Sequence, residues 1–243
     1  MKKIIALAVV TSALTFAGKN VIPAPSEPVA VTPPPAMEDK LTSHGIGLKI
    51  GTLGVGVDIE HYFSKKHALR FNPNYFKYTK DNKEIGDVSY DAKLTLKNVG
   101  LLYDYHPWES SFRISLGAYY NGNKLTGTAR PSGSVTFGGK TYNPGEIGRV
   151  EAKVDFKKVA PYLGIGWSSP DKEGWHFIGD IGVMYVGSPK IWTKAYASKT
   201  LPNYNQIQAD LDNRVETEKQ KIYNDVKKYK WWPVISIGIQ KKF

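Results

Sequence analysis

The sequence contains no cysteine, which excludes disulfides, thiolate metal sites and a lipid-modified cysteine. It also lacks any apolar run of about 18 residues or more, so no transmembrane helix is predicted. Methionine is scarce, at 3 residues, whereas the 243 residues include 23 glycines and 15 tyrosines. This balance favours strands and tight turns over helices.

Motifs of common catalytic and nucleic-acid-binding sites are missing as well. The 5 histidines are scattered without His-Glu-x-x-His spacing, and there is no Gly-x-Ser-x-Gly motif. The net charge is +11, but no RNA-binding or helix-turn-helix pattern accompanies it, so nucleic acid is not expected as a partner. Asp104 and His106 are the nearest acid–histidine pair, and their place at a short turn favours a structural role. We therefore predict no enzyme, no catalytic residue, no metal and no cofactor.

The N-terminal region is typical of an exported protein. Residues 1–17 combine two lysines, an apolar run and small residues, which predicts a signal peptide cleaved after Ala17. Residues 18–42 are rich in proline and favour extended polyproline II, as in a periplasmic lead-in; binding to a partner or to the cell wall is the alternative. Residues 43–243 then form the main domain.

From Gly45 onward, apolar and polar residues alternate, as they do in strands. The parity changes at Gly51–Gly54, which indicates either a tight hairpin or a bulge. In segment 88–105 the apolar residues occupy the even positions up to Leu96, and Asp91, Lys93 and Thr95 lie opposite. Alternation of this kind recurs in residues 46–50, 55–63, 68–78, 112–121, 150–156, 161–167, 175–185 and 235–243.

Alternation alone does not distinguish a soluble sandwich from a membrane barrel, but other features do. Short connections (64–67, 106–110, 169–174) alternate with longer ones (79–87, 124–149, 187–229), as periplasmic turns and outer loops do. Aromatic residues near strand ends are typical of membrane-interface girdles. These aromatics are Trp108, Trp167, Trp175, Tyr185, Trp231 and Trp232. We predict an all-β fold: an eight-stranded antiparallel transmembrane β-barrel in a Gram-negative outer membrane, with apolar faces toward lipid.

One segment has helical periodicity. Residues 205–229 place Ile207, Leu211, Val215 and Ile222 on one side, with charges over the rest. We predict a helix in the last extracellular loop, packed on other loops as a lid. A helix lying on the lipid surface is the alternative.

Four stretches carry a family resemblance: "DYHPWESSFRISLGAYYN", "APYLGIGW", "DIGVMYVGSP" and "YKWWPVISIGIQKKF". They resemble the small bacterial outer-membrane β-barrel proteins that include the carbapenem-associated outer-membrane proteins. The resemblance covers about residues 45–243. It implies uptake of basic amino acids such as ornithine, and it implies that Phe243 is the C-terminal signal for the barrel assembly machinery. The Pro-rich lead-in and the final strand depart from that family.

Charged residues placed inward by parity are the candidate lumen site: Lys49, Asp58, Glu60, Arg70, Arg113, His176 and Asp180. An eight-stranded barrel is just wide enough for its own side chains to fill it, and buried charges must pair. One hypothesis is an ion-pair plug in a non-conducting structural or adhesive barrel. Another is a narrow porin for small, cationic solutes, with Asp58 and Glu60 giving selectivity. An outer-membrane lipid-modifying enzyme is the third.

Basic residues in the loops suggest lipid partners. They could contact outer-membrane lipids and the phosphates of lipopolysaccharide, or they could simply be solvated. The candidates are Lys124, Arg130, Lys140, Lys190, Lys194 and Lys199.

Overall fold

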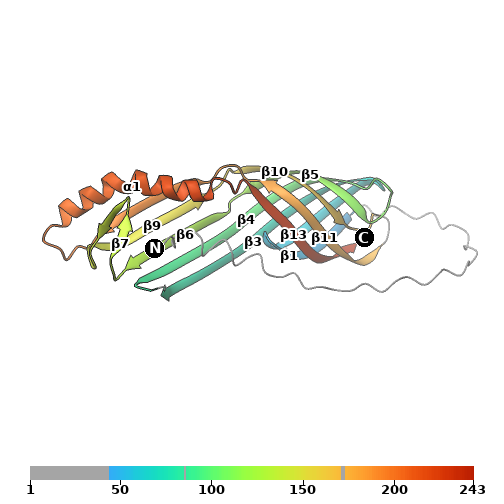
Figure 1. Cartoon of the computed structure of the whole chain (residues 1–243). Coiled ribbons are helices and arrows are strands. Elements are labelled where there is room, and N and C mark those ends of the chain that lie inside the picture. Colours follow the sequence, from blue (N-terminus) through green and yellow to red (C-terminus); the bar gives the residue numbers. More distant parts are fainter. Residues whose placement is uncertain (1–43, 85, 171–172) are drawn as a thin grey trace, which may run out of the picture.

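The computed structural model describes residues 44–84, 86–170 and 173–243. The predicted signal peptide and lead-in lie outside these residues. Eight antiparallel strands form a closed ring in the order β1-β2-β3-β4-β5-β10-β11-β13, closed by the β1–β13 pairing (Figure 1). The ring strands are β1 (His44–Gly51), β2 (Gly54–Ser64), β3 (His67–Glu84), β4 (Val88–Tyr105), β5 (Phe112–Asn121), β10 (Val159–Trp167), β11 (Gly174–Tyr185) and β13 (Trp231–Lys242). The predicted fold class is confirmed.

Gly51–Gly54 is a hairpin turn and not a bulge. β1 and β2 pair in unbroken register from His44↔His61 to Gly51↔Gly54. Gly54 has φ +101°, a conformation that glycine adopts at little cost. The barrel wall therefore ends early on this side, while β3 and β4 continue beyond it.

Three further strands branch from β4 and extend the sheet beyond the ring. β6 (Lys124–Pro131) pairs with the first half of β4, β9 (Ile147–Asp155) pairs with β6, and β12 (Lys190–Ala197) pairs with β9. The segments predicted as longer connections, 79–87, 124–149 and 187–229, do lie at the end opposite the short turns, but much of 124–149 and residues 190–197 form strands and not irregular loops. The alternating segment 150–156 lies in β9 of the extension, and the segment 161–167 lies in β10 of the ring.

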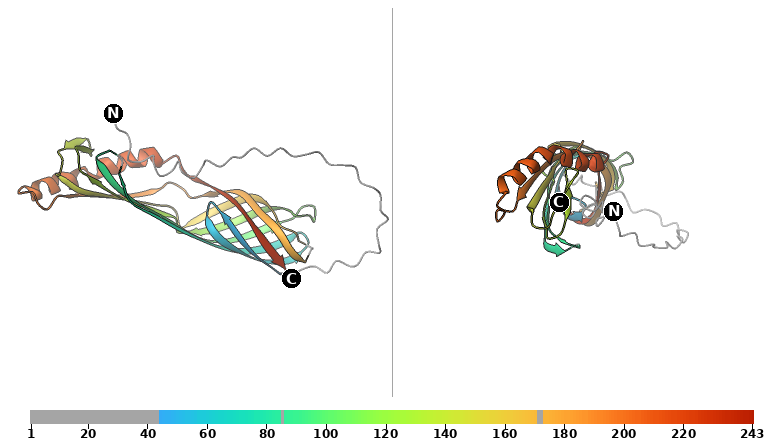
Figure 2. Two further views of the ribbon diagram at one scale, coloured as in Figure 1. Left: turned by 90° about the horizontal axis from the view of Figure 1, so that it is seen from below. Right: turned by 60° about the vertical axis from the view of Figure 1, so that its left-hand side comes forward.

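One helix, α1 (Tyr204–Val226), packs on this extension at the end of the molecule remote from Phe243 (Figure 2). Its buried Ile207 and Leu211 meet β12 and a small hairpin, β7 (Val135–Phe137) with β8 (Lys140–Tyr142). The helix thus packs on protein, as predicted. Within the described residues, no helix is both long and apolar enough to cross a membrane. We call the extension strands, the parts of β3 and β4 that pair beyond the ring, the β7–β8 hairpin and α1 together the platform.

The sheet reverses its polarity between ring and platform. In the ring half of β4, Leu101 and Tyr103 face outward and Asp104 faces the interior. In the platform half of β4, Lys93 faces outward, and Leu94 lies on the side that continues the barrel interior. On the platform, α1 packs against this same side at β12. The prediction that the apolar residues of 88–96 and 150–156 face lipid was wrong, because these segments lie beyond the ring, where the outward side carries charged residues.

Candidate functional site: the barrel interior

The interior of the ring holds a neutral cluster of buried charges. Alternation turns every second residue of each ring strand inward, and eight strands bring these side chains within contact of one another. The cluster comprises Lys49, Arg70, Arg113, Lys242, Asp58, Glu60, Asp104 and Asp180. Four cations thus face four carboxylates, so their formal charges cancel.

Arg70 lies at the centre of this cluster. Its Nε donates to Asp104 Oδ2 at 2.8 Å, and its Nη1 donates to both carboxylate oxygens of Asp180 at 3.0 Å. Arg70 is on β3 and Asp180 on β11, four strands apart in either direction around the ring. This ion pair therefore crosses the whole lumen.

Arg113 makes a second crossing, nearer the end of the barrel that carries His44 and Phe243. Its guanidinium donates to Glu60, to Asp180 Oδ1 at 2.9 Å and to Ser168 Oγ at 2.8 Å. Glu60 also accepts a hydrogen bond of 2.6 Å from the Tyr62 hydroxyl. Lys242 completes this group, with its Nζ 3.6 Å from Glu60 and 3.3 Å from the centre of the Tyr62 ring.

Lys49 and a set of amides close the other side of the cluster. Lys49 Nζ is 3.1 Å from both Asp58 Oδ1 and Asp180 Oδ2. Asn72 donates to Asp58 at 2.7 Å and accepts from Tyr119 at 2.8 Å. Each carboxylate therefore already has cationic or hydrogen-bonding partners from the chain itself.

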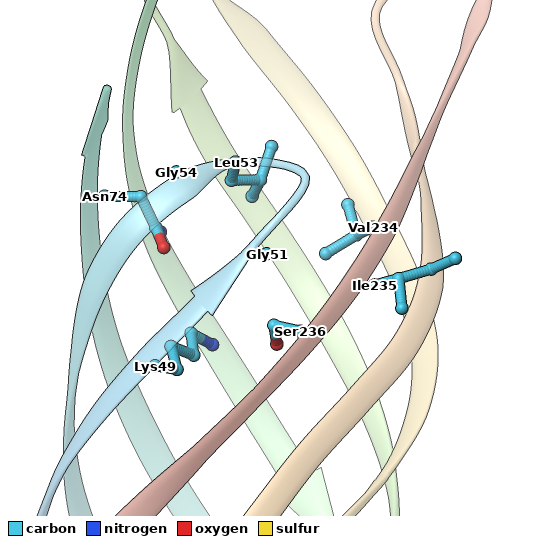
Figure 3. Close-up of a pocket in the computed structure, with 8 residues that line it drawn as sticks. All are labelled: Lys49, Gly51, Leu53, Gly54, Asn74, Val234, Ile235 and Ser236. Carbon is cyan, nitrogen blue, oxygen red and sulfur yellow. The ribbon is translucent and has the colours of Figure 1, made fainter. Parts of the chain in front are cut away.

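An apolar layer lies above the charges, toward the platform. It consists of Leu53, Leu102, Tyr119, Ala160, Tyr162, Met184, Val186 and Val234, with Phe156 and Trp232 against it. A cavity of about 10 Å³ remains between the layers, below Leu53 and Val234 and beside Lys49 and Ser236 (Figure 3). A cavity of this size has room for about one water molecule.

The structure brings six of the seven predicted lumen residues into one network: Lys49, Asp58, Glu60, Arg70, Arg113 and Asp180. His176 is half-buried on the same inward side of β11, nearer Phe243, at the register position of Gln240. Asp104 and Lys242 are members that sequence reasoning missed. Asp104 shares the parity of apolar Leu102, and Lys242 shares the parity of the buried Gln240.

The predicted interface aromatics lie on both sides of the wall. Trp108, Trp167, Trp175 and Trp231 are exposed, and Tyr185 packs against Trp231 in a tilted arrangement with ring centroids 4.9 Å apart. Trp232 points the other way, half-buried against Phe156 in the apolar layer. Phe243 is 54% exposed at the end of the barrel where the short turns lie.

The acid–histidine pair considered from sequence has other partners. His106 is buried, and its Nδ1 lies 2.9 Å from the Ser110 carbonyl oxygen. This contact stabilises the turn between β4 and β5. The Asp104 carboxylate accepts from Arg70 and Ser115. Across the described residues, no group of three or more His, Asp or Glu is arranged to hold a metal ion.

The platform has its own polar centre at Asp210 of α1. Asp210 accepts hydrogen bonds from Lys140 at 2.8 Å, from Tyr142 at 2.7 Å and from Arg214 at 3.0 Å. The hydrogen bonds from Lys140 and Tyr142 lower the pKa of Asp210. Burial, and then the hydrogen bond to Asp210, raise the pKa of Tyr142.

Gln208 of α1 covers the edge of the platform sheet. Its Oε1 accepts from the backbone N–H of Ala197 at 2.9 Å, and its Nε2 donates to the Ala195 carbonyl at 3.1 Å. These groups lie on the outer edge of β12, where an uncovered strand could pair with another chain.

Comparison with known proteins bears on the fold. No protein-family model matches the chain, and no curated protein matches it in sequence. The solved structure of CarO2 from Acinetobacter baumannii aligns with 84% of this chain and 100% of its own, at TM-score 0.56 and 23% identity. This chain has the β-barrel fold of CarO. A second structure, CarO from the same organism, aligns at TM-score 0.53 and 22% identity, covering 84% of this chain and 98% of CarO. The resemblance predicted from the sequence is confirmed, and at this identity the likeness to CarO establishes the fold alone.

Proposed function

We propose that this protein is a closed β-barrel of a bacterial outer membrane, which holds the platform outside the cell and does not conduct solutes. The outward side of the ring supports the membrane location. Leu48, Phe177 and Ile237 are 59%, 88% and 69% exposed and belong to a band of apolar side chains around the barrel. Such a band is unfavourable in water and suits the hydrocarbon core of a bilayer.

The connections between ring strands support the orientation. The turns after β2, β4 and β10 are short and lie at the end that carries His44 and Phe243. The platform is built from the longer connections at the opposite end. Short turns face the periplasm and long connections face outward in barrels of this kind, which places the platform outside the cell.

The observation that carries the closed-barrel proposal is the crossing of the lumen by Arg70 and Asp180. A solute would have to displace this pair, the Arg113 group and the apolar layer above them. Separating a buried ion pair leaves uncompensated charge in a low-dielectric interior, which is strongly unfavourable. Asp58 and Glu60, the candidates for cation selectivity, are already neutralised by Lys49 and Arg113.

Swelling of liposomes that contain the purified barrel tests this proposal. Liposomes that contain the wild-type protein should swell no faster than protein-free liposomes, both in lysine-like and in neutral solutes. The double variant Arg70→Ala/Asp180→Ala removes the crossing pair without changing net charge, and it should swell faster if it folds. Heat-modifiable migration on gels verifies that both proteins are folded barrels.

The competing hypothesis gives a different result. If wild-type liposomes swell above the protein-free rate, and faster with the cationic solute, the barrel is a narrow cation-preferring porin. That outcome would refute the closed barrel and leave its membrane location intact.

A further inference from the structure

The outward face of the platform carries an ordered basic surface next to the apolar band. Strand register places five residues side by side across five strands in the order Lys77, Thr95, Lys124, Asp155 and Lys190. The next cross-strand row, one step farther from the ring, is Thr79, Lys93, Thr126, Lys153 and Trp192. We call these two rows the basic belt.

The belt has five lysines and one acidic residue. Asp155 is bound to Lys153, whose Nζ lies 2.8 Å from Oδ2. Lys77, Lys93, Lys124 and Lys190 make no ion pair with any other residue that the structure describes. Lys93 lies diagonal to Lys77 and Lys124 on the neighbouring strands, about 7–8 Å from each, and Lys190 lies two strands, about 10 Å, from Lys124. Lysine side chains are long enough to bring two such ammonium groups to one anionic group.

The height of the belt suits a membrane headgroup. On β3, the exposed Tyr75 is the last aromatic residue of the outward side, and Lys77 is the next outward residue. On β4, from the ring toward the platform, the outward residues Leu101 and Val99 are followed by Lys97 and then by the belt position Thr95. Lysines that directly follow an apolar band lie at the level of the polar headgroups, which extend about 5–7 Å beyond the hydrocarbon.

We propose that the basic belt binds phosphate groups of lipopolysaccharide in the outer leaflet. Phosphates are compact anions, lysine ammonium groups are point-charge donors that bind them, and neighbouring threonine hydroxyls can donate further hydrogen bonds. The inference rests on the proposed membrane location and orientation. It supplies a ligand for the basic belt, in which five lysines outnumber one acidic residue.

The same geometry removes some basic residues from the site. Arg130 is paired with Asp91, and Lys140 is bound to Asp210 on the opposite side of the platform. Lys194 lies one row beyond the belt, opposite Glu151. Of the cations considered from sequence, only Lys124 and Lys190 are therefore belt residues.

Binding of lipopolysaccharide to the folded, detergent-solubilised protein tests the proposal. The test variant is Lys77→Gln/Lys93→Gln/Lys124→Gln/Lys190→Gln. The control variant, Lys219→Gln/Lys221→Gln/Lys227→Gln/Lys228→Gln, removes the same charge from the helix region. The belt variant should bind at least about 10-fold more weakly than wild type, and the control should bind within about 2-fold of it. Added salt should weaken wild-type binding more than belt-variant binding.

Chemically dephosphorylated lipopolysaccharide separates phosphate recognition from contact with acyl chains. Wild type should bind it as weakly as the belt variant binds the intact glycolipid. Equal binding of the intact and dephosphorylated forms, or equal loss in the belt and control variants, would overturn the proposal. Liposome swelling and heat-modifiable migration are read separately, so a failed closed-barrel hypothesis is distinguishable from a failed lipid site.

Discussion

Arg70 on β3 and Asp180 on β11 form an ion pair at 3.0 Å between strands on opposite sides of the barrel. Each strand is also joined to its neighbours by backbone hydrogen bonds, which set the circumference of the ring. The buried pair adds a connection through the centre. The interior charges therefore fix which residues of distant strands face each other.

We expect Arg70→Met to destabilise the barrel by about 3–5 kcal/mol, because it leaves buried carboxylates without their central cation. Arg70→Met/Asp104→Leu restores the balance of charge and should recover at least half of that loss. Urea unfolding in lipid vesicles, followed by gel migration, measures both. A loss of stability below about 1 kcal/mol for the single variant would mean that water or ions compensate the carboxylates that have lost Arg70.

The reversal of polarity predicts opposite tolerance to lysine on the two parts of the outward face. Ile237→Lys in the ring should cost about 2–4 kcal/mol, because it places a charge near the middle of the hydrocarbon. The matched variant Thr128→Lys, on the outward side of the platform, should change stability by less than about 0.5 kcal/mol. Equal tolerance of the two substitutions would show that the ring is not surrounded by lipid.

Gly138 predicts a local defect in the platform. It has φ +56°, and a Cβ at this position would overlap Cβ of Arg214 on α1. Gly138→Ala should therefore release the β7–β8 hairpin from the helix and raise hydrogen exchange in both, with the barrel unchanged. Gly139→Ala is the control, because Gly139 has φ +89° and no atom within 4 Å of its Cβ position. Both variants carry a backbone cost of about 1–2 kcal/mol, so only the hydrogen exchange by which Gly138→Ala exceeds Gly139→Ala reports the contact with the helix.

Asp210 predicts how the platform responds to acid. Its pKa is lowered in the folded state, so the stability that it contributes is complete above the unfolded value of about 3.9. That contribution is lost as the pH falls through the lower folded pKa. The helical circular dichroism of wild type should therefore melt at a higher temperature than that of Asp210→Asn near neutral pH. The difference should vanish in strong acid; a difference independent of pH would exclude this ionic role.

Tyr142 predicts a loss of platform stability in alkali. Its pKa is raised in the folded state, so above about pH 10 the unfolded chain loses the phenol proton first. Stability therefore falls as the pH rises from about 10 toward the folded pKa. Tyr142→Phe keeps the ring and should remove this alkaline dependence of the helix melting temperature. Persistence of the dependence in Tyr142→Phe would assign it to another group.

Much of the ring could be predicted from sequence because a period of two is a local signal. Alternation in "GIGLKIG" and in residues 112–121 assigns each side chain to one face without knowledge of its partner. That is why Lys49, Arg113 and Asp180 could be placed inward together. Which of them pair across the lumen depends on the closed ring order, which no local pattern contains.

The platform could not be predicted for the same physical reason. β6 and β12 are short segments rich in small and polar residues, and they become strands only by pairing with β4 and β9. Alternation also does not state which face meets lipid. In β4, apolar Leu94 and charged Asp104 lie on the same face of one strand, so the apolar face is inward in the platform half and outward in the ring half. The prediction that apolar residues face lipid was therefore wrong for the platform half.

The length of β4 has a mechanical consequence. Its 18 residues run without interruption from the short turn before β5 to the far part of the platform, a span of about 60 Å. The hydrocarbon core is only about 30 Å thick, so roughly half of this strand stands beyond it. In the proposed orientation, the membrane anchor and the platform outside the cell therefore share one continuous strand, which has no break between them. A force applied to the platform would then be transmitted into the barrel wall and would not be absorbed by a flexible joint.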